Sequence, residues 1–217
     1  MSALKPWERG PFELIVHAEA HFRGGRDFDR RMAIISYDNS IEVSIHTYLD
    51  LHPIQRLNRE YKTDQIRIWL ENYHSKIDFF IEEVSSRGLS LVCDKAEFVW
   101  YHKVRNGQYH TGDPTIPQGE DVEGIREAAL WVFGVLFEIE DMEQRLAREM
   151  DLRFPSPPER EEEYDEAIND LYGEVTVGGR DYSVSEVLFA VDDAYYRKLG
   201  ADLCGATEDE EGEEQSA

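Results

Sequence analysis

The sequence has 217 residues, 41% of them hydrophobic, which is enough to bury one sizeable core and at most a small appended subdomain. Its 46 acidic residues outnumber its 23 basic residues, and the net charge of −23 opposes nucleic-acid binding over most of the surface. Any RNA-binding site must therefore be a local basic cleft.

The cysteines and the hydropathy pattern exclude several other classes of protein. Cys93 and Cys204 lie far apart without paired spacing, so they predict neither a disulfide framework nor a zinc site, and a reducing cytosol fits them best. The first ten residues lack the apolar core of a signal peptide, and the longest apolar run, residues 128–137, is too short to cross a bilayer. We therefore expect a soluble, cytoplasmic protein that does not associate with membranes.

Helical periodicity dominates the body of the chain, and no segment before residue 150 alternates like a strand. Apolar residues recur at intervals of three and four over residues 12–22, 34–48 and 66–84. The breaking sequences GGRD, HP and RG follow these three segments in turn. Each segment is therefore predicted to be one continuous helix.

Two further helices are predicted on either side of a short polar motif. Asp94 and Glu97 form a D-x-x-E capping pattern for a short helix that extends to about Val104. The acidic turn GEDVEG begins a long amphipathic helix over residues 122–139. Three tryptophans on apolar helix faces are predicted to lie in the core: Trp69, Trp100 and Trp131. Residues 1–150 are thus expected to form an all-α, up-and-down helical bundle.

The composition changes after the bundle. Residues 151–161 contain three prolines among charged residues and are predicted to be a linker. Residues 162–204 are expected to form a small subdomain, with a helix near 159–172, a hairpin EVTVGGRDYS that turns at its two central glycines, and a last helix near 183–199. The acidic tail, residues 205–217, is predicted to be disordered.

The stretch VRNGQYHTGDPTIPQ combines Arg105 and His110 with turn-forming residues. In an unbroken helix, residues five apart point about 140° away from each other. If the helix ends near Arg105 and Gly107 permits a tight turn, both side chains converge on one group. The guanidinium binds phosphate and the imidazole transfers protons near neutral pH, so together they are sufficient for metal-free cleavage of RNA through its own 2′-hydroxyl.

RNGQYH, between a short helix and a long amphipathic final helix, resembles the R-N-x-x-x-H motif of the HEPN superfamily. The resemblance covers roughly residues 10–145. It implies that Arg105 neutralises the scissile phosphate, that His110 acts as acid or base, and that Asn106 holds the loop or contacts the substrate. It also implies a homodimer in which two copies of the motif face one cleft, and it requires no cofactor and no metal.

Members of this superfamily are commonly metal-independent endoribonucleases of toxin–antitoxin and antiviral defence systems. The resemblance therefore implies cleavage of RNA, with tRNA as one candidate, and an antitoxin or another defence-system protein as a partner. The alternative is a non-catalytic HEPN module that binds nucleotide or RNA, or scaffolds a larger defence complex. The intact motif favours the enzyme, whereas the charge of −23 favours the scaffold.

Each residue predicted to lie near the motif has two possible roles. His102 and Lys103 add positive charge to the cleft or belong to an exposed helix face, and Tyr109 stacks on a base or packs against the final helix. By analogy with the family, Asp38 or Glu42 orients His110; the alternative is a solvated helix face.

One dense basic cluster lies outside the motif. It either follows a nucleic-acid backbone or is neutralised by nearby acids, and we favour neutralisation. The cluster consists of Arg23, Arg26, Arg30 and Arg31.

Overall fold

The computed structural model describes residues 3–110, 115–155 and 159–214, without the side chains of residues 110 and 206–214. The chain divides into two compact units, Met1–Pro155 and Ser156–Ala217. In the described residues, no helix is long and apolar enough to span a membrane.

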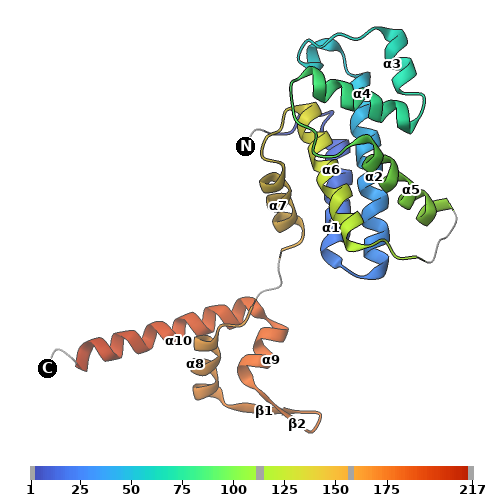
Figure 1. The fold of residues 1–217 in the computed structure, drawn as a ribbon. Coiled ribbons are helices and arrows are strands. Elements are labelled where there is room, and N and C mark those ends of the chain that lie inside the picture. The colour runs from blue at the N-terminus through green and yellow to red at the C-terminus, as the bar shows by residue number, and fades with distance from the viewer. Residues whose placement is uncertain (1–2, 111–114, 156–158, 215–217) are drawn as a thin grey trace. The chain divides into compact units, whose positions relative to one another are not determined.

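The fold is all-α, as predicted, because the described residues form ten α-helices and only one small two-stranded sheet (Figure 1). The first unit holds seven of these helices and one short 3-10 helix. They are α1 (Arg9–Gly24), α2 (Asp27–Asp50), η1 (Pro53–Arg56), α3 (Thr63–Trp69), α4 (Tyr73–Ser86), α5 (Lys95–His110), α6 (Gly119–Phe137) and α7 (Met142–Arg153).

Helix α2 is the centre of the first unit, because it packs against α1, α4, α5 and α6 (Figure 1). Apolar side chains of α2 are buried on more than one face, and a line of small residues, Ser36, Ser40 and Ser44, is buried at intervals of four. Small side chains let neighbouring helices approach closely. The buried surface of α2 also includes Asp38, which is fully inaccessible to solvent.

Helix α5 is held against α6 by a close contact at Gly124. A Cβ at this position would lie 2.8 Å from Cζ of Tyr101 and closer still to its hydroxyl oxygen. Any side chain at position 124 would therefore require the Tyr101 ring of α5 to move.

We expect Gly124→Ala to destabilise the protein by about 1–3 kcal/mol, because it forces the Tyr101 ring away from α6. This sign is opposite to helix propensity, which favours alanine by about 1 kcal/mol. Chemical denaturation measures the change. Gly119→Ala on the same helix is the control, because no atom lies within 4 Å of its added Cβ. Equal stability of the two variants would show that the Tyr101 contact does not constrain α5.

The predicted helix over residues 66–84 is wrong as a single element. The chain forms α3 and then α4, because Asn72 lies between them in extended conformation and its Oδ1 accepts a hydrogen bond from the backbone N of Ser75 at 3.0 Å. An asparagine that caps a helix start in this way competes with continuation of the preceding helix. Helix α7, which begins after the left-handed Glu138, was not predicted.

The second unit contains α8 (Glu162–Tyr172), β1 (Glu174–Val177), β2 (Arg180–Ser183), α9 (Val184–Val191) and α10 (Asp193–Glu214). The predicted hairpin is confirmed: β1 and β2 are antiparallel, and Gly178 and Gly179 both have positive φ at the turn.

The last helix differs from its prediction in two respects. It is divided at Asp192, whose Oδ1 accepts a hydrogen bond from Tyr195 N at 2.9 Å. Its backbone also remains helical to Glu214, in the segment predicted to be disordered after Gly205. Glutamate is a strong helix former, and it occupies five of the nine positions 206–214.

Candidate functional site

Helix α5 does not end near Arg105, as the convergence of Arg105 and His110 required. It continues through Gly107 to His110. In a continuous helix, positions five residues apart lie about 140° apart around the axis, so Arg105 and His110 of one chain begin on different faces. The side chain of His110 lies outside the described residues, so its predicted role stays a prediction. The expected end of this helix near Arg105 was wrong, because a single glycine such as Gly107 is tolerated inside a helix.

Asp38 on α2 contacts two residues of α5, His102 and Arg105. Its Oδ2 lies 2.9 Å from Nδ1 of His102 and 3.4 Å from Nε of Arg105. The carboxylate is fully buried, while the side chains of His102 and Arg105 are 18% and 14% exposed. His102 and Arg105 are three residues apart and therefore share one face of α5.

The His102 ring is fixed on both sides. It stacks on Tyr73 of α4, with 3.6 Å between ring centroids and 15° between the planes. The Tyr73 hydroxyl donates to the backbone oxygen of Phe98 at 3.2 Å. Burial, with the negative charge of Asp38 nearby, raises the pKa of Tyr73 far above its ordinary value, so this ring stays neutral. The imidazole thus has one orientation relative to Arg105.

The guanidinium of Arg105 is held by two asparagines. Nη2 donates to Oδ1 of Asn39 at 3.0 Å, and Nη1 donates to Oδ1 of Asn106 at 2.9 Å. Each terminal nitrogen retains a second N–H group, which is the arrangement that binds two phosphate oxygens. The cation centre also lies 5.0 Å from the ring centroid of Tyr109. Asn39 was not predicted as a site residue, although it follows Asp38 directly.

Tyr109 and Glu42 each contact a basic side chain of the protein. Tyr109 is 63% exposed and lies against Arg105 rather than packing into the bundle. Glu42 accepts a hydrogen bond from Lys76 on α4 at 2.8 Å. The expected carboxylate partners of His110 therefore have other contacts, Asp38 with His102 and Glu42 with Lys76.

A cavity of about 580 Å³ lies beside the motif, between α5 and the segment before α6. Trp100, Lys103 and Asn106 line it, together with Ile116 and Pro117. The prediction that Trp100 lies in the core is wrong, because this side chain is 50% exposed.

The Trp100 indole has a fixed orientation. Its Nε1 donates to Oδ1 of Asp121 at 2.8 Å, and Nζ of Lys103 lies 5.8 Å from the ring centroid. An oriented indole beside a flexible cation is suited to stacking on a nucleobase while the cation contacts phosphate. Because Asn106 contacts both the cavity and Arg105, the cavity adjoins the phosphate-binding candidate.

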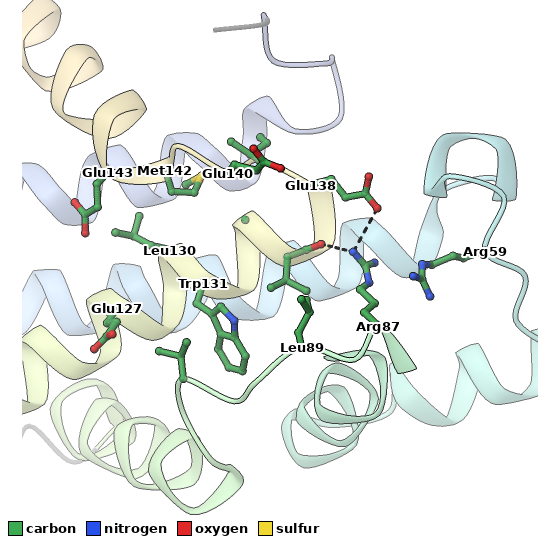
Figure 2. A pocket seen from close by; sticks show the side chains of 14 residues that line it. Arg59, Arg87, Leu89, Glu127, Leu130, Trp131, Glu138, Glu140, Met142 and Glu143 are labelled. Atoms are coloured by element: carbon green, nitrogen blue, oxygen red, sulfur yellow. Dashed lines mark hydrogen bonds and ion pairs between the residues drawn. The ribbon is translucent and has the colours of Figure 1, made fainter. Parts of the chain in front are cut away.

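A second cavity, of about 620 Å³, lies between the segment that follows α4, helix α6 and the start of α7 (Figure 2). Its Arg87 is occupied by internal contacts, at 2.8 Å from Glu83 and 3.0 Å from the Tyr48 hydroxyl, and Figure 2 shows it joined to Glu138 and to a carbonyl oxygen of α6. These contacts give Arg87 a structural role, and among the described residues neither Arg105 nor Asn106 lines this cavity.

Three of the four arginines in the basic cluster pair with nearby acids, as favoured from the sequence. Arg23 pairs with Glu19 at 3.2 Å, Arg26 with Asp29 at 2.7 Å and Arg30 with Asp27 at 2.8 Å. These contacts make the cluster a poor surface for nucleic acid.

The described residues contain no group of three or more histidine, cysteine or acidic side chains able to hold a metal ion. The chain matches no protein-family model, no curated protein and no solved structure.

Proposed function

We propose that this protein is a metal-independent endoribonuclease of the HEPN type that acts in the cytoplasm. The observation that carries the proposal is the arrangement of Arg105. Its guanidinium is partly exposed, is oriented by Asn39 and Asn106, and lies on the same helix face as a histidine that contacts a buried carboxylate. An oriented guanidinium next to an imidazole is suited to stabilising a phosphoryl transition state.

The reaction proposed is attack of the ribose 2′-oxygen on the neighbouring phosphorus. Arg105 binds the non-bridging phosphate oxygens and neutralises the charge that develops on them. His110, the histidine of the motif, transfers a proton. The base next to the scissile phosphate stacks on Trp100 in the adjoining cavity, which selects single-stranded over paired RNA.

Two copies of the chain are proposed to form the active unit. The continuous α5 separates Arg105 from His110 of the same chain, so a facing copy is the simplest source of a histidine opposite each arginine. A defence-system protein such as an antitoxin is the proposed regulator, and tRNA is one candidate substrate.

A second function rests on a different observation. Both terminal nitrogens of Arg105 already donate to asparagines, and its Nε lies 3.4 Å from the buried Asp38. An arginine with these contacts also stabilises the α2–α5 interface without catalysis. On this alternative the protein is a non-catalytic module that binds RNA or nucleotide, or scaffolds a larger complex.

The test is cleavage of total RNA and labelled tRNA by the purified full-length protein in EDTA. The proposal predicts cleavage that survives chelation and leaves 2′,3′-cyclic phosphate and 5′-hydroxyl ends. RNA carrying a 2′-O-methyl group at the cleaved position should resist, because the nucleophile is blocked. His110→Ala should lower the rate by roughly 10²-fold or more. Binding of RNA without cleavage would support the second function instead.

A further inference from the structure

The sequence suggested only that His102 adds positive charge to the cleft, but its contacts in the structure indicate a more specific role. Nδ1 lies 2.9 Å and 3.2 Å from the two oxygens of Asp38. An ionised carboxylate only accepts hydrogen bonds, so it holds the imidazole proton on Nδ1. The lone pair of the neutral ring is then on Nε2. In the described part of the chain, Nε2 has no protein hydrogen-bond partner.

This arrangement supplies what a general base needs. The buried Asp38 fixes the tautomer and stabilises the imidazolium that forms when Nε2 takes a proton, while stacking on Tyr73 fixes the ring plane. Arg105 contacts the same carboxylate from one helical turn further along α5. A phosphate bound by Arg105 therefore lies on the same side of α5 as His102.

We propose that His102 is the general base of this site and takes the proton of the attacking 2′-hydroxyl. The inference rests on the proposed function. The 2′-oxygen forms a bond to phosphorus as its proton moves to Nε2 of His102. The bond from phosphorus to the 5′-oxygen breaks, and that oxygen takes a proton from the motif histidine, His110. Asp38 is a positioning residue, because it acts through His102.

The charged and titratable groups around His102 come from three helices. Asp38 and Glu42 belong to α2, Tyr73 and Lys76 to α4, and Arg105 to α5. Glu42 and Lys76 pair with each other at 2.8 Å, and Tyr73 stays neutral. Asp38 is thus the charged group in the described residues that contacts the proposed base, and Arg105 contacts the same carboxylate. Lys103, the next residue along α5, has its Nζ 5.8 Å from the Trp100 ring centroid.

The first measurement is the pH dependence of single-turnover RNA cleavage by the full-length protein. Wild type should lose rate toward low pH, because protonation disables the base. His102→Gln, whose amide donates a hydrogen bond to Asp38, should be about 10²–10³-fold slower and should lack this low-pH limb. His46→Gln is the matched control, since His46 is exposed on α2. It should retain the wild-type profile.

The second measurement separates a base from an acid. In RNA whose scissile 5′-oxygen is replaced by sulfur, the leaving group departs without protonation. This substrate should restore cleavage by His110→Gln and leave His102→Gln slow. The reverse pattern, or wild-type rates in His102→Gln, overturns the assignment of His102 while the nuclease function stands.

Folding is checked by circular dichroism melts and by binding of uncleavable 2′-O-methyl RNA. If His102→Gln does not fold, the double variant with Asp38→Asn replaces it, because it leaves no unpaired buried carboxylate. If the wild-type protein does not cleave RNA, both the proposed nuclease function and the role of His102 are overturned. This result is distinct from wild-type rates in His102→Gln, which would overturn only the role of His102.

Discussion

Arg105→Lys is expected to reduce RNA cleavage by roughly 10²–10³-fold, the loss typical of removing one preorganised group that stabilises a transition state. Lysine keeps the positive charge near Asp38, so the ion pair at the α2–α5 interface is retained. It loses the planar donors that contact Asn39 and Asn106 and the pair of N–H groups for two phosphate oxygens. Steady-state rates and thermal melts measure the two effects separately.

The kinetic pattern distinguishes catalysis from structure. A transition-state contact lowers kcat and kcat/KM together, whereas a purely structural arginine changes the melting temperature and leaves the rate of folded protein unaltered. Arg67→Lys is the control, because Arg67 is 82% exposed on α3 and pairs only loosely with Asp64 at 3.7 Å. Full activity of Arg105→Lys would contradict the phosphate-binding role.

The largest expected effect on stability comes from Arg126 on α6. Its Nε donates to the buried Glu19 of α1 at 2.7 Å, and Glu19 also accepts from the Tyr37 hydroxyl of α2 at 2.8 Å. This network joins the three helices that contain most of the core. Arg126→Ala is expected to cost about 2–4 kcal/mol in the free energy of unfolding, because Glu19 stays buried and keeps only weaker partners.

The same variant should change the pH dependence of stability. Burial alone would raise the pKa of Glu19, but hydrogen bonds from Arg126 and Tyr37 outweigh it and lower that pKa below its ordinary value. A carboxyl with a lowered folded-state pKa stabilises the protein above its unfolded pKa, and this contribution is lost as pH falls through the folded pKa. Without Arg126, burial dominates and raises the pKa, so the deficit of Arg126→Ala should shrink from pH 7 to pH 4.

Arg153→Ala provides the matched control in denaturant titrations at both pH values. Arg153 makes a two-point contact with Glu13 at 2.6 Å, as Arg126 does with Glu143. Glu13 is 53% exposed, so its loss of a partner should cost less than about 1 kcal/mol. Equal effects of the two variants would show that the buried contact to Glu19 adds nothing to the surface pairs.

The residue types of the candidate site were predicted from the sequence, but their contacts were not. Arg105 and Asn106 follow from the motif, and Asp38 and His102 were selected as neighbours. The pairing of Asp38 with His102 joins residues 64 positions apart, and no local pattern encodes such a distance. Asn39 was missed for the same reason. Its partner, Arg105, is 66 positions away, and the contact exists only because α5 packs beside α2.

The sequence alone determined the helical class, the hairpin at Gly178-Gly179 and the cap of α5 by Asp94 and Glu97, because these depend on periodicity and on contacts within a few residues. Tertiary packing decided the rest. The close fit of α5 on α6 at Gly124 and the exposure of Trp100 depend on which faces meet. So does the pairing of His102 with the buried carboxylate of Asp38, because long-range contacts are fixed by the complementary shapes of whole helices.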